Sequence, residues 1–228
     1  VIEIGPGLGT LTSRLVEKAG KVIAIELDKK MLQILNDRFA LYNNFSLINE
    51  DVLKVNLNDL IQQENTQNYT VKIVANLPYY ITTPIIMKLL EEKLNIDSIT
   101  VMVQKEVADR LTEIPGGKNT GAITYCVYYY SEPQEVLTVP NTSFVPEPKV
   151  CSEVIKLNIR KEPPVVLKDE KIFFKVVKAS FMQRRKTLLN GLANAGIASK
   201  EKLKEILQEV ILSALSRSGF FKEAAFYG

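Results

Sequence analysis

Residues 76–79, Asn-Leu-Pro-Tyr, close an apolar run and bring together groups that suit one kind of chemistry. The side-chain oxygen of Asn76 and the carbonyl of Leu77 can accept the two N–H bonds of an exocyclic amine on an aromatic base. Accepting both bonds orients the nitrogen and makes its lone pair more available to an electrophile. Pro78 fixes the turn, and Tyr79 offers a ring face to the base. A strand end, a proline turn and core-covering aromatics would explain these residues equally well, so the rest of the chain must decide.

A glycine-rich stretch, Glu-Ile-Gly-Pro-Gly-Leu-Gly at residues 3–9, lies between an expected strand and an expected helix. Glycines let the backbone turn tightly and approach a ligand closely. In a doubly wound sheet this turn lies at the carboxyl edge, where ligands bind. The dinucleotide-binding pattern G-x-G-x-x-G needs a third glycine where this chain has Thr10 or Thr12, so that pattern fails. The spacing E-x-G-x-G-x-G resembles instead the first motif of S-adenosylmethionine-dependent methyltransferases.

Two carboxylates follow the next two expected strands. Glu26 ends the second strand, where its carboxylate can accept hydrogen bonds from both ribose hydroxyls of an adenosine cofactor. Asp51 follows the third strand and is placed for the exocyclic amine of the cofactor's adenine. Either residue could be an ordinary surface carboxylate. The occurrence of the glycine-rich loop, Glu26 and Asp51 in order at successive strand ends favours a cofactor site.

The composition excludes several classes of function. The chain has 228 residues, 46% of them hydrophobic, which allows a substantial core. It contains no histidine, so imidazole bases, Ser-His-Asp triads and His-ligated metals are excluded. Cys126 and Cys151 have no metal-binding spacing, so we expect neither a metal site nor a disulfide framework. No apolar run is long enough to span a membrane and no signal peptide is visible, so we expect a cytoplasmic protein.

Short apolar runs alternate with helical patterns over the first part of the chain. This alternation predicts an α/β fold with a doubly wound, Rossmann-like parallel sheet. The first helix is expected to bury Leu11, Leu15 and Val16 and to end at Gly20. Because the chain begins inside an expected strand, we expect an N-terminal segment to be missing. The expected strands are 1–4, 21–27, 45–51, 71–77 and 98–104, and the expected helices are 10–20, 29–40 and 84–94.

The pattern changes after residue 121. Residues 122–139 and 149–159 have strand composition, which predicts an antiparallel hairpin that completes the sheet. A proline-rich stretch at 160–166 then predicts a hinge. We therefore expect a methyltransferase domain at 1–159 and a small helical domain at 160–228.

The helical domain has two clear helix signals. Residues 169–181 are expected to form a helix with Asp169 as a possible N-cap, and Ser199 is in the cap position of a second helix. The first helix is expected to bury one stripe of apolar residues, which consists of Ile172, Phe173, Val176, Val177 and Phe181.

Charge is distributed unevenly along the chain. Residues 1–148 carry 13 Lys and Arg and 18 Asp and Glu, a net charge of −5, whereas residues 149–228 carry 16 and 8, a net charge of +8. This asymmetry favours a polyanionic partner that binds mainly to the C-terminal region. Three consecutive cations, Arg184, Arg185 and Lys186, are more than one amphipathic face requires. We interpret them as contacts to an RNA backbone, with a solvated helix face as the alternative.

Two prolines stiffen the stretch Ser-Phe-Val-Pro-Glu-Pro-Lys-Val at residues 143–150. The stiff loop can hold Phe144 toward a base pocket while Lys149 meets a phosphate. A core phenylalanine packed against proline is the simpler alternative.

Six strings occur in the order and spacing of the small-subunit (16S) rRNA adenine dimethyltransferases, which this chain resembles from residue 1 to about residue 195. The tail from residue 213 does not match the family's usual ending, and the stretch that begins at Gly121 lacks an expected basic residue. The strings are EIGPGLGTLT, IELD, NLPYYITTPI, VQKEVADRL, FVPEPKVCSEVIKL and FMQRRKTLLNGL.

The resemblance implies transfer of methyl groups from S-adenosylmethionine to N6 of two adjacent adenosines near the 3′ end of small-subunit rRNA, late in subunit assembly. It implies a pre-ribosomal particle as partner, and we expect a monomer. It also implies that the target adenine is held by Asn76 to Tyr79 and stacked by Phe144. The expected cofactor-binding residues are Gly5, Pro6, Gly7, Gly9, Glu26, Leu27, Asp51, Val52 and Asn76, and the expected RNA-binding residues are Lys149, Arg184, Arg185 and Lys186.

Three other functions compete with this interpretation. The large-subunit rRNA dimethyltransferases that confer macrolide resistance share the loop and an N-[IL]-P-Y motif, but they more often have Ile at the position of Leu77 and lack the QRRKTL string. A DNA N6-adenine methyltransferase would need a duplex-reading domain, for which the sequence gives no sign. A non-catalytic RNA-binding assembly factor would not need an intact motif at residues 76–79.

Overall fold

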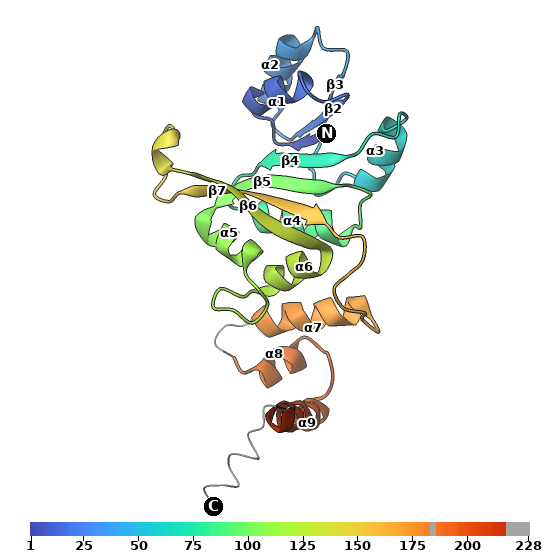
Figure 1. Cartoon of the computed structure of the whole chain (residues 1–228), viewed down its shortest axis with the longest axis vertical. Helices are drawn as coiled ribbons and strands as arrows, with labels where there is room; N and C mark the ends of the chain where they lie inside the picture. The colour runs from blue at the N-terminus through green and yellow to red at the C-terminus, as the bar shows by residue number, and fades with distance from the viewer. Residues whose placement is uncertain (183–185, 218–228) are drawn as a thin grey trace, which may run out of the picture. The chain divides into compact units, whose positions relative to one another are not determined.

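The computed structural model describes residues 1–182 and 186–217, and the chain divides into two units. The division lies between Val165 and Val166, inside the proline-rich stretch predicted as a hinge and a short way beyond the expected boundary after residue 159. The first unit contains the sheet and the second contains helices (Figure 1).

The first unit is built on a seven-stranded mixed sheet with the strand order β3-β2-β1-β4-β5-β7-β6. The first five strands in chain order run parallel, and β7 pairs antiparallel with both β5 and β6. The predicted parallel sheet with a closing antiparallel hairpin is therefore confirmed. The strands are β1 (Ile2–Ile4), β2 (Val22–Glu26), β3 (Phe45–Asn49), β4 (Lys72–Asn76), β5 (Ser98–Gln104), β6 (Ser131–Val139) and β7 (Ser152–Ile159).

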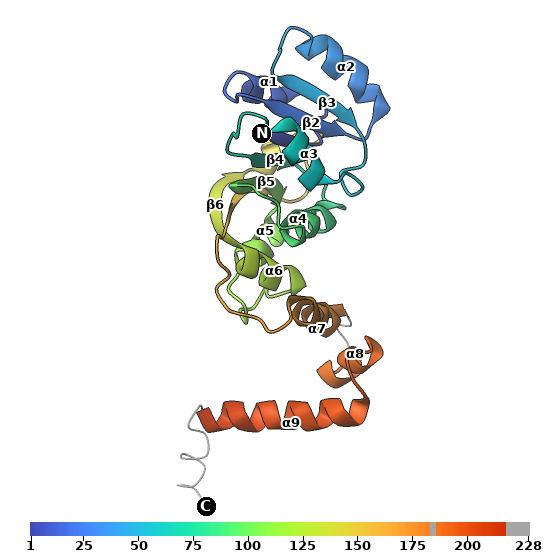
Figure 2. The same ribbon diagram turned by 90° about the vertical axis from the view of Figure 1, so that its right-hand side faces the viewer.

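Helices connect the parallel strands, as a doubly wound fold requires. Helix α6 packs against α4, α5 and β6, and these helices lie together beside the second half of the sheet in both views (Figures 1 and 2). The helices of this unit are α1 (Thr10–Val16), α2 (Lys29–Phe39), α3 (Leu57–Glu64), α4 (Thr82–Glu91), α5 (Lys105–Thr112), α6 (Ala122–Tyr130) and the short 3-10 helix η1 (Asn141–Ser143).

The prediction of a strand from residue 122 is wrong, because Ala122–Tyr130 is helix α6 and the strand begins only at Ser131. The helix is apolar on most sides and buries Ile123, Cys126 and Val127. A helix that is buried all round lacks the amphipathic period that distinguishes a helix from a strand in sequence. Its start is fixed by Thr124, whose hydroxyl accepts the N–H of Gly121 and donates to the carbonyl of Arg110 over 2.8 Å.

The predicted apolar stripe of the first helix is confirmed only in part: Val16 is buried and Leu15 packs against the same core, but Leu11 is not buried. Helix α1 buries Thr12 and Val16 and ends at Val16, whereas Leu11 is exposed. The hydroxyl of Thr12 donates a 2.6 Å hydrogen bond to the buried carboxyl of Glu3 on β1, so a polar contact sets the inward face of this helix.

The second unit contains α7 (Glu170–Met182), α8 (Leu188–Asn194) and α9 (Lys200–Arg217). Both predicted caps are confirmed: Asp169 accepts the N–H of Ile172 over 2.9 Å, and Ser199 accepts the N–H of Lys202 over 3.3 Å. The core of this unit consists of Ala179, Leu192 and Leu203.

The buried face of α7 differs from the predicted stripe. Phe174, Val177 and Ala179 are buried, whereas Ile172 and Phe181 are exposed. The reason is the close approach of α8, where an added Cβ on Gly191 would lie 3.0 Å from the carbonyl oxygen of Ala179. That approach places the small Ala179 at the contact with α8, while Val177 of the predicted stripe is buried as expected.

Candidate active site

The carboxyl ends of β1 to β4 border a cavity of about 250 Å³ in the first unit. Because these strands are parallel, the residues that follow them meet at one edge of the sheet, which is where ligands bind in such folds. The cavity brings together seven of the predicted site residues, which are Gly5, Glu26, Leu27, Asp51, Val52, Leu77 and Pro78. Pro6, Gly7, Gly9, Asn76, Tyr79 and Phe144 are not among the residues that line it.

The glycine-rich loop uses its glycines in two ways. Gly5, Gly7 and Gly9 all have positive φ, at 68°, 56° and 79°, where other residues are strained. A Cβ added to Gly5 or Gly7 would meet no atom within 4 Å, so these positions leave open space beside the backbone. A Cβ on Gly9 would lie 2.6 Å from the ring of Phe39, so this glycine allows α1 to pack against α2. The first two glycines therefore fit a ligand that approaches the backbone.

Side chains outside the loop hold its backbone in place. The guanidinium of Arg38 donates to the carbonyl of Leu8 over 2.7 Å and to the hydroxyl of Ser13 over 3.1 Å. The hydroxyl of Ser13 in turn donates to the carbonyl of Gly9 over 2.7 Å. Sequence reasoning missed Arg38, because it lies on α2 and only the fold brings it to the loop. These contacts give the loop one fixed conformation.

Glu26 joins the loop to the cavity. Its Oε2 accepts the N–H of Gly7 over 3.1 Å and its Oε1 accepts the N–H of Asp28 over 2.8 Å. The residue is 8% exposed and lines the cavity. Since each carboxylate oxygen can accept two hydrogen bonds, both oxygens keep capacity for hydroxyl donors. Glu26 can therefore bind a ribose while it supports the loop, and Leu27 beside it is largely exposed to the cavity side.

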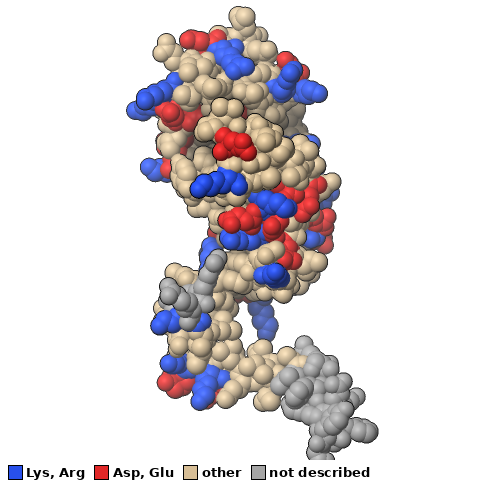
Figure 3. All heavy atoms as spheres, turned by 90° about the vertical axis from the view of Figure 1, so that its left-hand side faces the viewer, with Lys and Arg blue, Asp and Glu red and all other residues tan. Residues whose placement is uncertain are grey.

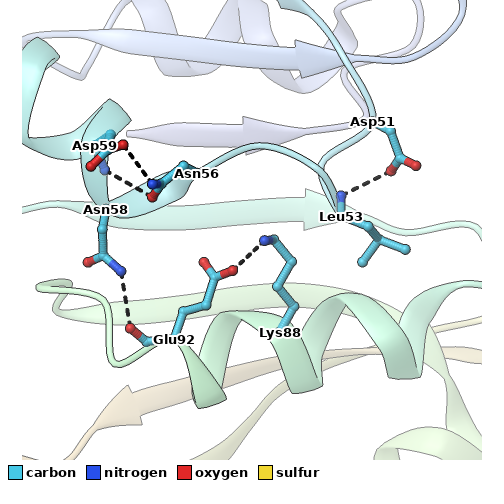
Figure 4. Close-up of polar contacts among 7 residues, drawn as sticks. All are labelled: Asp51, Leu53, Asn56, Asn58, Asp59, Lys88 and Glu92. Carbon is cyan, nitrogen blue, oxygen red and sulfur yellow. Dashed lines mark hydrogen bonds and ion pairs between the residues drawn. The ribbon is translucent and has the colours of Figure 1, made fainter.

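Asp51 lies at the start of a turn that leads to α3 (Figure 4). Its Oδ1 accepts the N–H of Leu53 over 3.0 Å, and its Oδ2 makes no hydrogen bond to the described residues. Val52, the next residue, is buried at 7% exposure and also lines the cavity. This geometry leaves one carboxylate oxygen available for an amine donor at the cavity. Glu50 also lines the cavity and was not predicted.

The segment after Asp51 is anchored at the start of α3, a helix that the sequence reading did not identify. Asn56 caps this helix by accepting the N–H of Asp59 over 3.2 Å. Asn58 donates to the carbonyl of Glu92 over 3.2 Å, and Glu92 pairs with Lys88 at the end of α4 (Figure 4). The contacts tie α3 to α4 and so fix the chain that carries Asp51.

Asn76 is the last residue of β4 and pairs with Met102 of β5. Its side chain is exposed and makes no hydrogen bond to the described residues. Leu77 is buried at 2% exposure, and the carbonyl of Pro78 accepts hydrogen bonds from the N–H of Ile81 and the hydroxyl of Thr82. The turn into α4 is thus fixed by Pro78, while the amide of Asn76 is free to bind a ligand at the sheet edge.

Two tyrosines follow this turn and differ in their surroundings. Tyr79 is 39% exposed, and its hydroxyl lies 3.1 Å from the hydroxyl of Ser152 on β7. Tyr80 is 85% exposed and lines the cavity, although it was not among the predicted site residues. The doubled tyrosine in the sequence was the signal that could have identified it.

Phe144 and Lys149 lie in the loop that connects β6 to β7. Strand β7 begins at Ser152, which pairs with Gln104 at the carboxyl end of β5, so this loop rises at the same edge as Asn76 (Figure 1, yellow). Phe144 is half-buried and Lys149 is exposed. Asn141 donates to the carboxylate of Glu147 over 2.7 Å and closes the loop on itself.

Two titratable side chains near this edge have shifted pKa values. Burial raises the pKa of the Glu3 carboxyl, and the hydrogen bond from Thr12 opposes this shift. The pKa of Lys105, at the start of α5, is raised by its hydrogen bonds to Asp109 and then Glu153, each 3.3 Å away. Both contacts favour the protonated form of Lys105.

The predicted RNA-binding cluster is described only in part. Lys186 is exposed, and Arg184 and Arg185 lie outside the described residues. Over the first unit, the face in Figure 3 carries Lys and Arg side chains interspersed with Asp and Glu. In residues 1–182 and 186–217, no group of three or more acidic, Cys or His side chains could hold a metal ion. Among the same residues, no helix is long and apolar enough to cross a membrane.

The family model of ribosomal RNA adenine dimethylases matches residues 1–227. The chain belongs to this family. Its members are S-adenosylmethionine-dependent methyltransferases. The match runs further than the predicted limit near residue 195 and includes the tail that was expected not to fit.

Curated relatives share about half of their residues with this chain. The "Ribosomal RNA small subunit methyltransferase A" of Geobacillus sp. (strain WCH70) is 51% identical over 211 residues, which cover 91% of this chain and 72% of that protein. The protein of the same name from Lachnoclostridium phytofermentans is 49% identical over 220 residues, which cover 95% of this chain and 76% of that protein.

Solved structures of two related enzymes share the fold. A dimethyladenosine transferase from Plasmodium falciparum is 30% identical, with a TM-score of 0.66, over 84% of this chain and 66% of that chain. The 23S rRNA methyltransferase ErmE is 25% identical, with a TM-score of 0.63, over 85% of this chain and 74% of that chain. The predicted fold class, recognised family and type of enzyme are confirmed by these comparisons.

Proposed function

We propose that this protein transfers methyl groups from S-adenosylmethionine to N6 of two adjacent adenosines near the 3′ end of small-subunit rRNA, giving N6,N6-dimethyladenosine. The observation that carries the proposal is the exposed amide of Asn76, which has no hydrogen-bond partner among the described residues, at the sheet edge that also holds Gly5, Glu26 and Asp51. The names of relatives about 50% identical support the small-subunit substrate.

The cofactor fits the cavity by the chemistry of its lining. Glu26 would bind the ribose hydroxyls through the free acceptor capacity of its carboxylate, and Asp51 would accept the adenine amine at Oδ2. Gly5 and Gly7 would let the backbone approach, since nothing else occupies the space beside them. Pro6 and Gly9 would shape the loop, and Leu27 and Val52 would flank the adenine. When bound, the cofactor supplies an electrophilic methyl group on sulfur.

Asn76 to Tyr79 would hold the target adenine. The side-chain oxygen of Asn76 and the carbonyl oxygen of Leu77 would each accept a hydrogen bond from one N–H of N6. These two bonds would direct the nitrogen lone pair toward the methyl group. Methylated N6 then releases a proton to solvent, so a strong base is not required, in keeping with a chain that has no histidine. Tyr79 and Phe144 would stack on the two faces of the base.

Substrate RNA would contact both parts of the chain. We assign residues 1–159 to the methyltransferase domain and residues 160–228 to an rRNA-binding domain. Lys149 beside the base pocket, and Arg184, Arg185 and Lys186 in the helical domain, would bind phosphates. We place the reaction on a pre-ribosomal particle in the cytoplasm and expect the protein to act as a monomer.

A large-subunit rRNA methyltransferase is the second candidate, because the solved ErmE structure shares the fold at 25% identity. The relatives named for the small subunit are about twice as similar in sequence, which favours the first function. A non-catalytic assembly factor would not need to keep the exposed Asn76 beside a cofactor cavity.

Labelled S-adenosylmethionine offered with three substrates tests the proposal. Unmethylated small subunits, large-subunit rRNA and duplex DNA are incubated separately with the protein, and the label in each is counted. We expect label in the small-subunit RNA alone. Label in the large-subunit rRNA would support the second candidate, and tight binding to small subunits without any label would support an assembly factor.

A further inference from the structure

Tyr79 and Ser152 form a hydrogen bond that joins two distant segments of the chain. Their hydroxyl oxygens lie 3.1 Å apart, although the residues are 73 positions apart in sequence. Tyr79 follows β4 and Ser152 begins β7, and β5 lies between these strands in the sheet. The bond therefore reaches across the carboxyl end of β5.

Ser152 is held firmly on its own side of this bond. It is fully buried, at 0% exposure, and its backbone pairs with Gln104 of β5 and with Val139 of β6. The neighbouring carbonyl of Cys151 also accepts the N–H of Lys105 over 3.1 Å. A side chain on a strand that is hydrogen-bonded to neighbours on both sides is held in a fixed position.

Tyr79 by contrast is 39% exposed at a turn. The ring of a tyrosine rotates about two side-chain torsions, and a fixed partner for its hydroxyl selects one orientation. Phe144 lies in the loop that leads into β7, and Ser152 is the first residue of that strand. Of the two rings that we assign to the target base, only that of Tyr79 is bonded to this buried serine.

We propose that Ser152 is a positioning residue for methyl transfer: it orients the ring of Tyr79 against the target adenine. This inference rests on the proposed function and on the assignment of Tyr79 to the base. It predicts that loss of the hydrogen bond changes the orientation of the target base. The cofactor cavity should stay intact, since neither Tyr79 nor Ser152 lines it. The effect should be largest on the second methylation, which requires a bulkier monomethylated base to sit in the same orientation.

The test compares Ser152→Ala, Tyr79→Phe and the double variant with the wild-type protein. Ser131→Ala is the matched control, because Ser131 is also 0% exposed, also begins a strand and also makes a hydrogen bond, to the carbonyl of Val127 over 3.0 Å. The measurements are the affinity for S-adenosylmethionine, kcat/KM on unmethylated small subunits, and the ratio of monomethyl to dimethyl adenosine by mass spectrometry.

We expect Ser152→Ala and Tyr79→Phe each to lower kcat/KM about fivefold, because a fivefold change corresponds to the net free energy of one hydrogen bond. The monomethyl fraction should rise and the cofactor affinity should stay within about twofold of the wild-type value. The double variant should match the single variants, because both changes remove the same bond. Ser131→Ala should lose about as much thermal stability as Ser152→Ala, but its ratio of monomethyl to dimethyl adenosine should equal that of the wild type.

Two results would overturn the inference: a Ser152→Ala protein with the wild-type product ratio and kcat/KM, or a double variant whose loss is the product of the two single losses. Failure of the proposed function gives a different result, because the wild-type protein would then produce no dimethyladenosine in small-subunit RNA.

Discussion

The backbone N–H of Gly7 donates a 3.1 Å hydrogen bond to Oε2 of Glu26, so the residue that we assign to the cofactor's ribose also holds the glycine-rich loop. The other oxygen of Glu26 accepts the N–H of Asp28 over 2.8 Å. Loop geometry and ribose binding are thus properties of one carboxylate, and a change at Glu26 affects both.

Replacement of Glu26 by Gln should weaken cofactor binding by at least about tenfold. The variant keeps the size of the side chain, but its NH₂ group must face one of the two N–H donors, which loses a partly buried hydrogen bond and costs about 1–1.5 kcal/mol. Isothermal titration with S-adenosylmethionine measures the effect. The control is Asp37→Asn, at an exposed position on α2. Equal affinities of Glu26→Gln and wild type would contradict the role of Glu26.

Gly5→Ala should mainly lower the affinity for the cofactor, whereas Gly9→Ala should mainly lower the stability of the fold. Both positions have positive φ, so each substitution costs about 1–2 kcal/mol of backbone strain. At Gly9 the added Cβ also overlaps the ring of Phe39 at 2.6 Å, which adds about 1–3 kcal/mol of overpacking. At Gly5 the Cβ meets no atom of the described residues within 4 Å and instead occupies space that we assign to the cofactor.

Chemical denaturation and cofactor titration separate these two effects. Gly9→Ala should be the less stable variant, whereas Gly5→Ala should lose cofactor affinity beyond what its small loss of stability explains. Full cofactor affinity in Gly5→Ala would contradict the placement of the ligand beside this loop.

Glu3 should make stability depend on pH. Burial raises the pKa of its carboxyl in the folded protein above the value in the unfolded chain, so proton uptake favours folding. The stabilising contribution is complete below the unfolded-state pKa and is lost as the pH rises through the folded-state pKa. Gln at this position does not titrate, and its carbonyl can still accept the hydroxyl of Thr12.

The free energy of unfolding of Glu3→Gln, relative to the wild type, should therefore increase as the pH is raised from about 4 to about 8. Urea denaturation at several pH values measures this difference. Glu162→Gln, at an exposed position in the first unit, controls for the loss of a charge. A difference that shrinks as the pH rises would show that the carboxyl is better accommodated when charged.

The parallel sheet and the edge that carries the cofactor residues could be predicted, because short stretches of sequence are enough to identify each strand and the residues at its end. Each parallel strand is a short apolar run, and Gly5, Glu26, Asp51 and Asn76 each lie at the end of a strand or within two residues of it. Once the strands are parallel, a common edge for these residues is a geometric consequence.

The missed features depend on packing between distant segments. Helix α6 is buried on most sides and therefore has no amphipathic period, and the inward face of α1 is set by the contact between Glu3 and Thr12. Arg38 reaches the glycine-rich loop only because α2 folds against it. The bond between Tyr79 and Ser152 crosses a third strand. Residue types and spacing contain no direct signal for such contacts.

Nucleoside mass spectrometry of small-subunit RNA, after incubation with either the wild-type protein or Asn76→Ala, tests the central claim most directly. The wild type should produce N6,N6-dimethyladenosine at two adjacent positions. Asn76→Ala should be slower by roughly 10²–10³-fold, because it removes an oriented acceptor for N6, while thermal stability changes little. An Asn76→Ala protein that forms dimethyladenosine at the wild-type rate would contradict the assignment of Asn76, and a wild-type protein that leaves small-subunit adenosines unmodified would contradict the proposed function.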